Sequence, residues 1–135
     1  IHQQTPGHGR IAIVNRSHSS GTRTVFVQTL LSGEQPSEAG LTEDSSGTVE
    51  RIVAQTPGAV SYIASSYVHP NEVVALKIDG VAPSDANVVN HTYPFWSYEH
   101  MFTNGPAKGD AARFIAFVSN DVTTLKTLGF IPVKR

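Results

Sequence analysis

The sequence has no cysteine, no long apolar run and little net charge, and each absence excludes a class of protein. Without cysteine the chain can form neither a disulfide nor a thiolate zinc site, and it has no cysteine nucleophile. No apolar run approaches the roughly 20 residues that a membrane-spanning helix needs. Charged residues make up 16% of the chain and the formal net charge is −1, so we expect no nucleic-acid partner.

The signatures of common catalytic and metal sites are absent as well. The six histidines show no His-Glu-x-x-His pattern, so we expect surface or packing histidines and no bound metal or other cofactor. No Gly-Lys pair occurs, which excludes the phosphate-binding P-loop, and there is no Gly-x-Ser-x-Gly elbow. His18 stands beside Ser19 and Ser20, but neighbouring residues on an extended turn tend to point apart, which argues against a base beside a nucleophile.

The chain length suits one domain. A chain of 135 residues can bury an apolar core but is too short for two ordinary domains. The sequence starts Ile1-His2-Gln3-Gln4, which is neither a methionine start nor a signal peptide, so we expect it to be a piece of a longer protein.

Strand and helix signals alternate along the chain. Residues 10–15 are apolar on both alternating faces, which favours a central strand covered by helices on both sides of a sheet. We predict further strands over 59–64 and 73–78, and helices over 22–31, 48–55, 83–90, 111–118 and 122–128. This order predicts an α/β fold of three αβα layers, with a mostly parallel sheet and ligands at the carboxyl ends of its strands.

Two segments lack a helical pattern. Residues 32–42 are rich in Gly, Ser, Glu and Pro, which indicates a surface loop. Residues 93–102 are aromatic and alternating, and we predict an extended segment that begins at a sheet edge, because Pro94 cannot donate within a sheet. This aromatic run suits strand packing better than a stacking surface.

The run from Arg16 to Thr22 joins the first predicted strand to the helix that follows. A helix start leaves backbone N–H groups without intrahelical partners and carries about half a positive charge. A tetrahedral oxyanion can accept from these amides while Ser20 and Thr22 add hydroxyl donors. Arg16 adds a planar, permanently charged guanidinium that suits phosphate. This layout predicts an anion-binding site.

The tetrapeptide Ser-Ser-Gly-Thr occurs at 19–22 and again at 45–48, each time before a predicted helix. Serine is a frequent helix N-cap, and capping is the role we expect for the second copy. Only the first copy has an arginine four residues before its second serine; the second copy has Thr42 at the equivalent place. We therefore place the anion at the first copy.

Several segments resemble one known family, in the family's order along the chain. They lie at 13–16, 19–22 with Phe26, 55–62, 78–83, 93–94, 114–118 and 128–132. Together they are similar to the phosphate-binding receptors of ABC transporters, the PstS-like branch of the type II periplasmic binding proteins.

The resemblance implies a two-lobed receptor that closes on inorganic phosphate, of which this sequence covers the second lobe and the C-terminal segment. The positions at which that lobe contacts the anion correspond to Arg16, Ser20, Gly21 and Thr22, with Ser19 as an additional candidate. The first lobe, which is not in this sequence, would supply the remaining ligands, including a carboxylate that accepts a proton from phosphate.

The sequence departs from the family at one position of this motif. Many relatives carry an acidic residue between the arginine and Ser-Gly-Thr, where it can hold the guanidinium in place, but His18 stands there in this chain. A neutral or positive histidine cannot pair with Arg16 in that way, so some other group must orient Arg16 if it binds the anion.

The resemblance leads to one main hypothesis and two alternatives. The main hypothesis is a non-enzymatic phosphate receptor outside the cytoplasm, in the periplasm or at the cell surface, with the full-length protein anchored as a lipoprotein. Residues 1–92 would form the second lobe, and 93–135 the hinge return and the C-terminal helices. The expected partners are phosphate, a membrane permease and the first lobe, or a second copy of the chain in a homodimer or domain swap.

The first alternative is a hydrolase or transferase that acts on phosphorylated substrates with Ser20 as its nucleophile. The second is an interaction domain in which the Ser-Gly-Thr turn only caps a helix.

Overall fold

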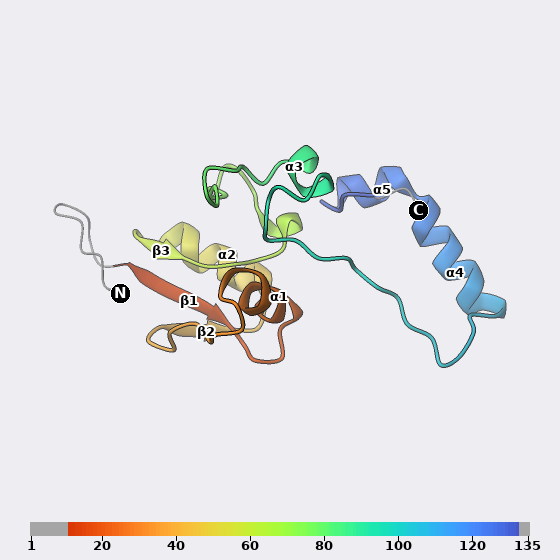
Figure 1. The fold of residues 1–135 in the computed structure, drawn as a ribbon, viewed down its shortest axis with the longest axis horizontal. Coiled ribbons are helices and arrows are strands. Elements are labelled where there is room, and N and C mark those ends of the chain that lie inside the picture. The colour runs from red at the N-terminus through yellow and green to blue at the C-terminus, as the bar shows by residue number, and fades with distance from the viewer. Residues whose placement is uncertain (1–10, 133–135) are drawn as a thin grey trace.

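The computed structural model describes residues 11–132 and contains a three-stranded parallel sheet, formed by the N-terminal half of the chain (Figure 1). The middle strand is β1 (Ala12–Arg16), flanked by β2 (Leu41–Glu43) and β3 (Ala59–Val60). The carboxyl half of β1 pairs with β2, so that Arg16 lies opposite Glu43, and its amino half pairs with β3. The prediction of a central first strand is confirmed.

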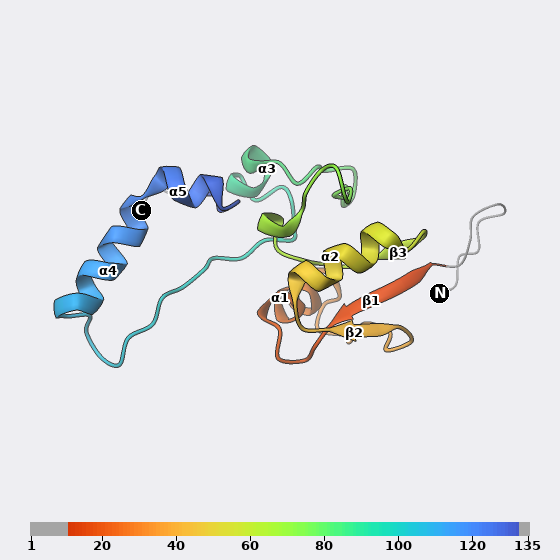
Figure 2. The same ribbon diagram turned by 180° about the vertical axis from the view of Figure 1, so that it is seen from behind.

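Two helices cover opposite faces of this sheet. α1 (Gly21–Leu30) follows β1, and α2 (Ser46–Gln55) follows β2. The chain crosses from β1 to β2 and then returns past β1 to β3; because such crossovers are right-handed, the two helices lie on opposite faces. Figures 1 and 2 show α1 nearer the viewer from one side and α2 from the other. The predicted three-layer α/β fold is confirmed.

The core is apolar at the middle of β1 and polar at its carboxyl end. Val14 and Val49, on β1 and α2, are almost fully buried. Burial of a valine side chain stabilises a fold by about 1.5–3 kcal/mol relative to its exposure. Asn15 and Arg16 directly follow Val14 and are also buried. Because buried polar groups require hydrogen-bond partners, this end of β1 needs a network around it.

The rest of the described chain contains a 3-10 turn η1 (Ser65–Tyr67) and the helices α3 (Asp85–Val89), α4 (Gly109–Asn120) and α5 (Val122–Thr127). These helices fall where the sequence predicts helices. Ser84 caps α3 by accepting from the backbone N–H of Asn87 at 3.3 Å. No helix among residues 11–132 combines the length and apolarity required to cross a membrane.

Three predictions for the strands are wrong. Residues 73–78 form no strand; Ile78 makes only an isolated bridge to Val81 across the Asp79-Gly80 turn, where both φ angles are positive. The strand predicted over 59–64 ends at Val60, and the predicted loop 32–42 contains the first two residues of β2. In each case the local sequence was a poor guide, because a strand exists only where a neighbouring strand pairs with it.

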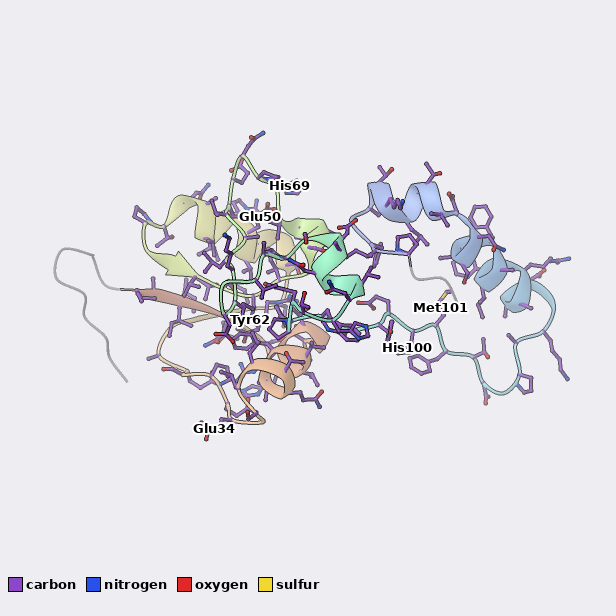
Figure 3. The ribbon with its side chains drawn as sticks, turned by 45° about the horizontal axis from the view of Figure 1, so that its top comes forward. Glu34, Glu50, Tyr62, His69, His100 and Met101 are labelled. Carbon is purple, nitrogen blue, oxygen red and sulfur yellow. The ribbon has the colours of Figure 1, made fainter. Side chains whose placement is uncertain are left out.

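The segment after Tyr93 leaves the sheet. Residues 94–107 take part in no backbone–backbone hydrogen bond within the described chain, so the predicted start at a sheet edge is wrong. Figure 2 shows this segment running away from the sheet to α4 and α5, and Figure 3 labels His100 and Met101 along it. The chain returns after α5, where Ser65 Oγ donates to the carbonyl of Gly129 at 3.0 Å.

Candidate anion-binding site

The predicted site residues lie at the carboxyl end of β1. Arg16 is the last residue of β1, Ser20 is the N-cap of α1, and Gly21 and Thr22 are the first two residues of that helix. In an open parallel sheet, ligands bind at the carboxyl ends of strands where the strand order reverses. The order β2-β1-β3 reverses at β1, so the fold puts these residues at the expected place.

The first turn of α1 presents unpaired backbone donors. Ser20 has extended backbone angles, and its Oγ accepts from the N–H of Arg23 at 3.3 Å. The amides of Gly21 and Thr22 have no acceptor among residues 11–132. Ser20 Oγ keeps its own proton, which an external acceptor can receive. Two amides, one hydroxyl and the helix dipole therefore favour an anion here.

Arg16 is held from the neighbouring strand. Its side chain is mostly buried, and the residue as a whole is only 7% exposed. Nε donates to the carbonyl of Glu43 at 3.3 Å, Nη2 to the carbonyl of Asp44 at 2.5 Å and Nη1 to Ser46 Oγ at 2.8 Å. All three acceptors are neutral, and no carboxylate among residues 11–132 lies within 4 Å of the guanidinium. The positive charge of Arg16 thus has no counterion in the described chain.

Tyr62 fixes the backbone of Arg16 from the other side of β1. Its hydroxyl accepts from the Arg16 N–H and donates to Asn15 Oδ1, both at 3.3 Å. Its ring stacks on Phe26 of α1 with centroids 4.0 Å apart. Asn15 Nδ2 in turn donates to the carbonyl of Ser37 at 2.8 Å. Figure 3 shows Tyr62 inside the body formed by the sheet and its helices.

Arg23 is a second buried arginine, and it stabilises the turn between β1 and α1. Its guanidinium donates to the carbonyl of Arg16 at 2.9 Å and to Glu38 Oε1 at 2.5 Å. The hydrogen bond from Arg23 lowers the pKa of Glu38. His18 Nε2 lies 3.7 Å from the same carboxylate, so His18 faces Glu38 and does not pair with Arg16.

Sequence reasoning missed the part that the second tetrapeptide plays. The predicted cap is confirmed, since Ser45 Oγ accepts from the N–H of Thr48 at 3.4 Å. Ser46 has an additional contact to Arg16 that was not predicted. The recurrence of the tetrapeptide was visible in the sequence, but its meaning depends on β2 lying beside β1, and that strand falls partly within the predicted loop.

The remaining chemistry of the site does not suit a hydrolase. Ser20 Oγ accepts from one backbone N–H, that of Arg23, and has no histidine or carboxylate partner among residues 11–132. Within the same range no three histidine, aspartate or glutamate side chains gather as metal ligands. The arrangement offers donors and positive charge to an anion.

Comparison with known proteins identifies the class. The model of the PBP superfamily domain matches residues 2–121, and the chain therefore belongs to this family. Within it, the chain is 47% identical over 127 residues to the phosphate-binding protein PstS of Bacillus subtilis (strain 168). The match covers 92% of this chain and 42% of that protein. The resemblance to phosphate receptors is confirmed.

Solved structures agree with the fold. The chain superposes with a TM-score of 0.74 and 26% identity on a phosphate ABC transporter substrate-binding protein of Clostridium perfringens that was solved with bound phosphate. That match covers 92% of this chain and 52% of the other. PstS of Borrelia burgdorferi shares the fold, with 22% identity and a TM-score of 0.67. That match covers 93% of this chain and 54% of the Borrelia protein. The chain spans about half the length of these relatives.

Proposed function

We propose that this chain binds inorganic phosphate and forms part of the extracytoplasmic substrate-binding protein of an ABC phosphate importer. The observation that carries the proposal concerns residues 11–132. Within that range the first two amides of α1 have no acceptor, and the nearby Arg16 has no carboxylate partner. The 47% identity to a phosphate-binding protein supports phosphate as the anion.

Each predicted residue has a definite part in this proposal. The backbone amides of Gly21 and Thr22 donate to phosphate oxygens, and Ser20 and Thr22 donate through their hydroxyls. Arg16 supplies charge-assisted hydrogen bonds, each worth roughly 1.5–3 kcal/mol. Ser19 is an additional candidate, since it is exposed and its hydroxyl contacts only Ser17 within the described chain.

The second part of the proposal concerns residues 93–135, which we assign to the hinge return and to helices that pack on a first lobe outside this sequence. The backbone of residues 94–107 supports it, because this segment makes no backbone–backbone hydrogen bond among residues 11–132 and is therefore available for addition to another sheet. Phe102, Phe114 and Phe117 are each more than 60% exposed, and such an apolar surface needs a partner. Residues 1–92 would form the second lobe.

The partner of residues 93–135 can be tested by sedimentation velocity. The chain is analysed alone and after co-expression with the part of the Bacillus subtilis relative that the match leaves uncovered. A one-to-one complex with that part, lost in Phe114→Asp, supports the first lobe as partner. A stable homodimer that excludes that part would instead identify a second copy of this chain.

Location and anchoring belong to the same proposal. We infer that the full-length protein works outside the cytoplasm, delivers phosphate to a membrane permease and is anchored there as a lipoprotein. The similar protein of Clostridium perfringens, named as an ABC transporter substrate-binding protein, supports this location. Fractionation of cells that make the full-length protein tests it, and recovery in the cytosol would contradict it.

Titration calorimetry with phosphate tests the binding function. Wild type is compared with Arg16→Ala and with Arg51→Ala, which removes an exposed arginine of α2 as the matched control. We expect Arg51→Ala to bind like wild type and Arg16→Ala to lose detectable binding. Affinity should be well below that of a complete receptor, because the other half of the ligands is outside this chain. Equal binding by all three, or none by wild type at millimolar phosphate, would overturn the proposal.

A further inference from the structure

We propose that Ser46 is a positioning residue for phosphate, acting through Arg16. The inference rests on the proposed function and extends it, because it assigns a role to the second Ser-Ser-Gly-Thr copy that capping does not explain. Ser45 supplies the cap of α2, whereas Ser46 Oγ lies 2.8 Å from Nη1 of Arg16. The two serines of one tetrapeptide thus have different partners.

The acceptors of Arg16 all come from one short stretch of chain, the β2–α2 connection. Glu43 is the last residue of β2, Asp44 follows it, and Ser46 is the first residue of α2. This connection is fixed at both ends. At the strand end, parallel pairing sets Arg16 opposite Glu43, and the N–H of Ser17 donates to the Glu43 carbonyl at 3.2 Å. At the helix end, Ser45 caps α2. The guanidinium therefore rests on a rigid support.

Ser46 is the side-chain part of that support. The other two acceptors are backbone carbonyls, which no substitution removes, while the Ser46 hydroxyl holds Nη1 and can be deleted. A guanidinium has five N–H donors, and three are used in these contacts. Two donors remain, which is the number that a bidentate contact with an oxyanion requires. Loss of the Ser46 contact frees Nη1 and makes the orientation of the remaining donors less defined.

The neutrality of this support has a consequence for the anion. A carboxylate would orient Arg16 and also neutralise it, whereas a hydroxyl and two carbonyls orient it and leave the charge in place. Burial of a cation without a counterion is costly, and a bound anion relieves that cost. Phosphate should therefore bind through a preoriented and fully charged arginine.

The test compares three variants by two independent measurements. Ser46→Ala removes the hydroxyl and Ser46→Thr retains it. Ser84→Ala is the control, because it removes the serine cap of α3 and leaves the connection that holds Arg16 intact. Phosphate affinity is measured by calorimetry. The Arg16 guanidinium N–H signals are followed by NMR in protein without phosphate, so this second measurement does not depend on binding.

Ser46→Ala should weaken phosphate binding about tenfold, the equivalent of one charge-assisted hydrogen bond, and should broaden or merge the Arg16 Nη signals. Ser46→Thr should stay within about twofold of wild type, as should Ser84→Ala although its melting temperature falls. If Ser46→Ala binds like wild type with unchanged Arg16 signals, this inference fails while the proposed function stands. If wild type does not bind phosphate, the proposed function fails and the inference with it.

Discussion

Removal of a single hydroxyl, in Tyr62→Phe, tests the network that fixes the carboxyl end of β1. The ring stays in place, so the stacking on Phe26 at 4.0 Å and the packing volume are retained. Only two hydrogen bonds are lost, one from the Arg16 N–H and one to Asn15 Oδ1. Tyr62 is 7% exposed and Asn15 is fully buried, so water has little access to replace the lost bonds.

The magnitude follows from these two losses. A buried polar group left without a partner costs about 1–3 kcal/mol. Both bonds measure 3.3 Å, which is long for an O–H or N–H donor, so we expect the lower part of that range for each. The sum is about 2–3 kcal/mol of unfolding free energy, which at about 3 °C per kcal/mol lowers the melting temperature by about 6–9 °C.

The assay is thermal unfolding followed by circular dichroism, with urea unfolding to obtain the free energy. Tyr98→Phe is the matched control, because Tyr98 is 51% exposed and its hydroxyl makes no hydrogen bond among residues 11–132. It should change stability by less than about 0.5 kcal/mol. An effect of Tyr62→Phe as small as that of Tyr98→Phe would refute the network as described.

Three further predictions concern other contacts. Burial alone would raise the pKa of Glu50, but hydrogen bonds from the backbone and ring of His69 lower it (Figure 3). The stability that these bonds add should therefore be lost as pH falls through the lowered pKa. Glu50→Gln should reduce this loss of stability in acid, measured by unfolding at a series of pH values, and an unchanged pH profile would contradict the prediction. Gly40→Ala should move β2 away from β1, because the added Cβ would lie 2.2 Å from the carbonyl oxygen of Ile13 in β1. Phosphate binding measured by calorimetry should then weaken, and unaltered stability and affinity would argue against this. Gly129→Ala should detach the end of α5 from Ser66, because the φ of Gly129 is +82° and the added Cβ would lie 2.7 Å from Ser66 Cα. Amide hydrogen exchange in α5 should become faster, and exchange as slow as in wild type would count against the contact between Gly129 and Ser66.

The elements that follow local rules were predictable from the sequence. The first strand, the helix after the Ser-Gly-Thr turn and the serine caps of α2 and α3 each depend on residues within a few positions of one another. The position of Arg16 at the end of β1 followed from the same reasoning, as did the α/β fold from the alternation of elements.

What holds Arg16 could not be predicted, since its partners are distant in sequence. Tyr62 lies 46 residues from Arg16 and Ser46 lies 30, and both reach it only because β2 and β3 flank β1. β2 has only three residues, too few for alternation to reveal, and its surroundings are rich in loop-forming types. The substitution of an acidic residue by His18 signalled that the arginine needs another support, and only the paired strands identify that support as the β2–α2 connection.

The central claim is that phosphate binds at the start of α1. A titration with phosphate followed by two-dimensional ¹H–¹⁵N NMR reports on each backbone amide separately. We predict saturable downfield shifts of the Gly21 and Thr22 amide protons, which have no acceptor in the described chain, and the loss of both shifts in Arg16→Ala. Phosphate-dependent shifts that leave these two amides unmoved, or that persist in Arg16→Ala, would contradict the account.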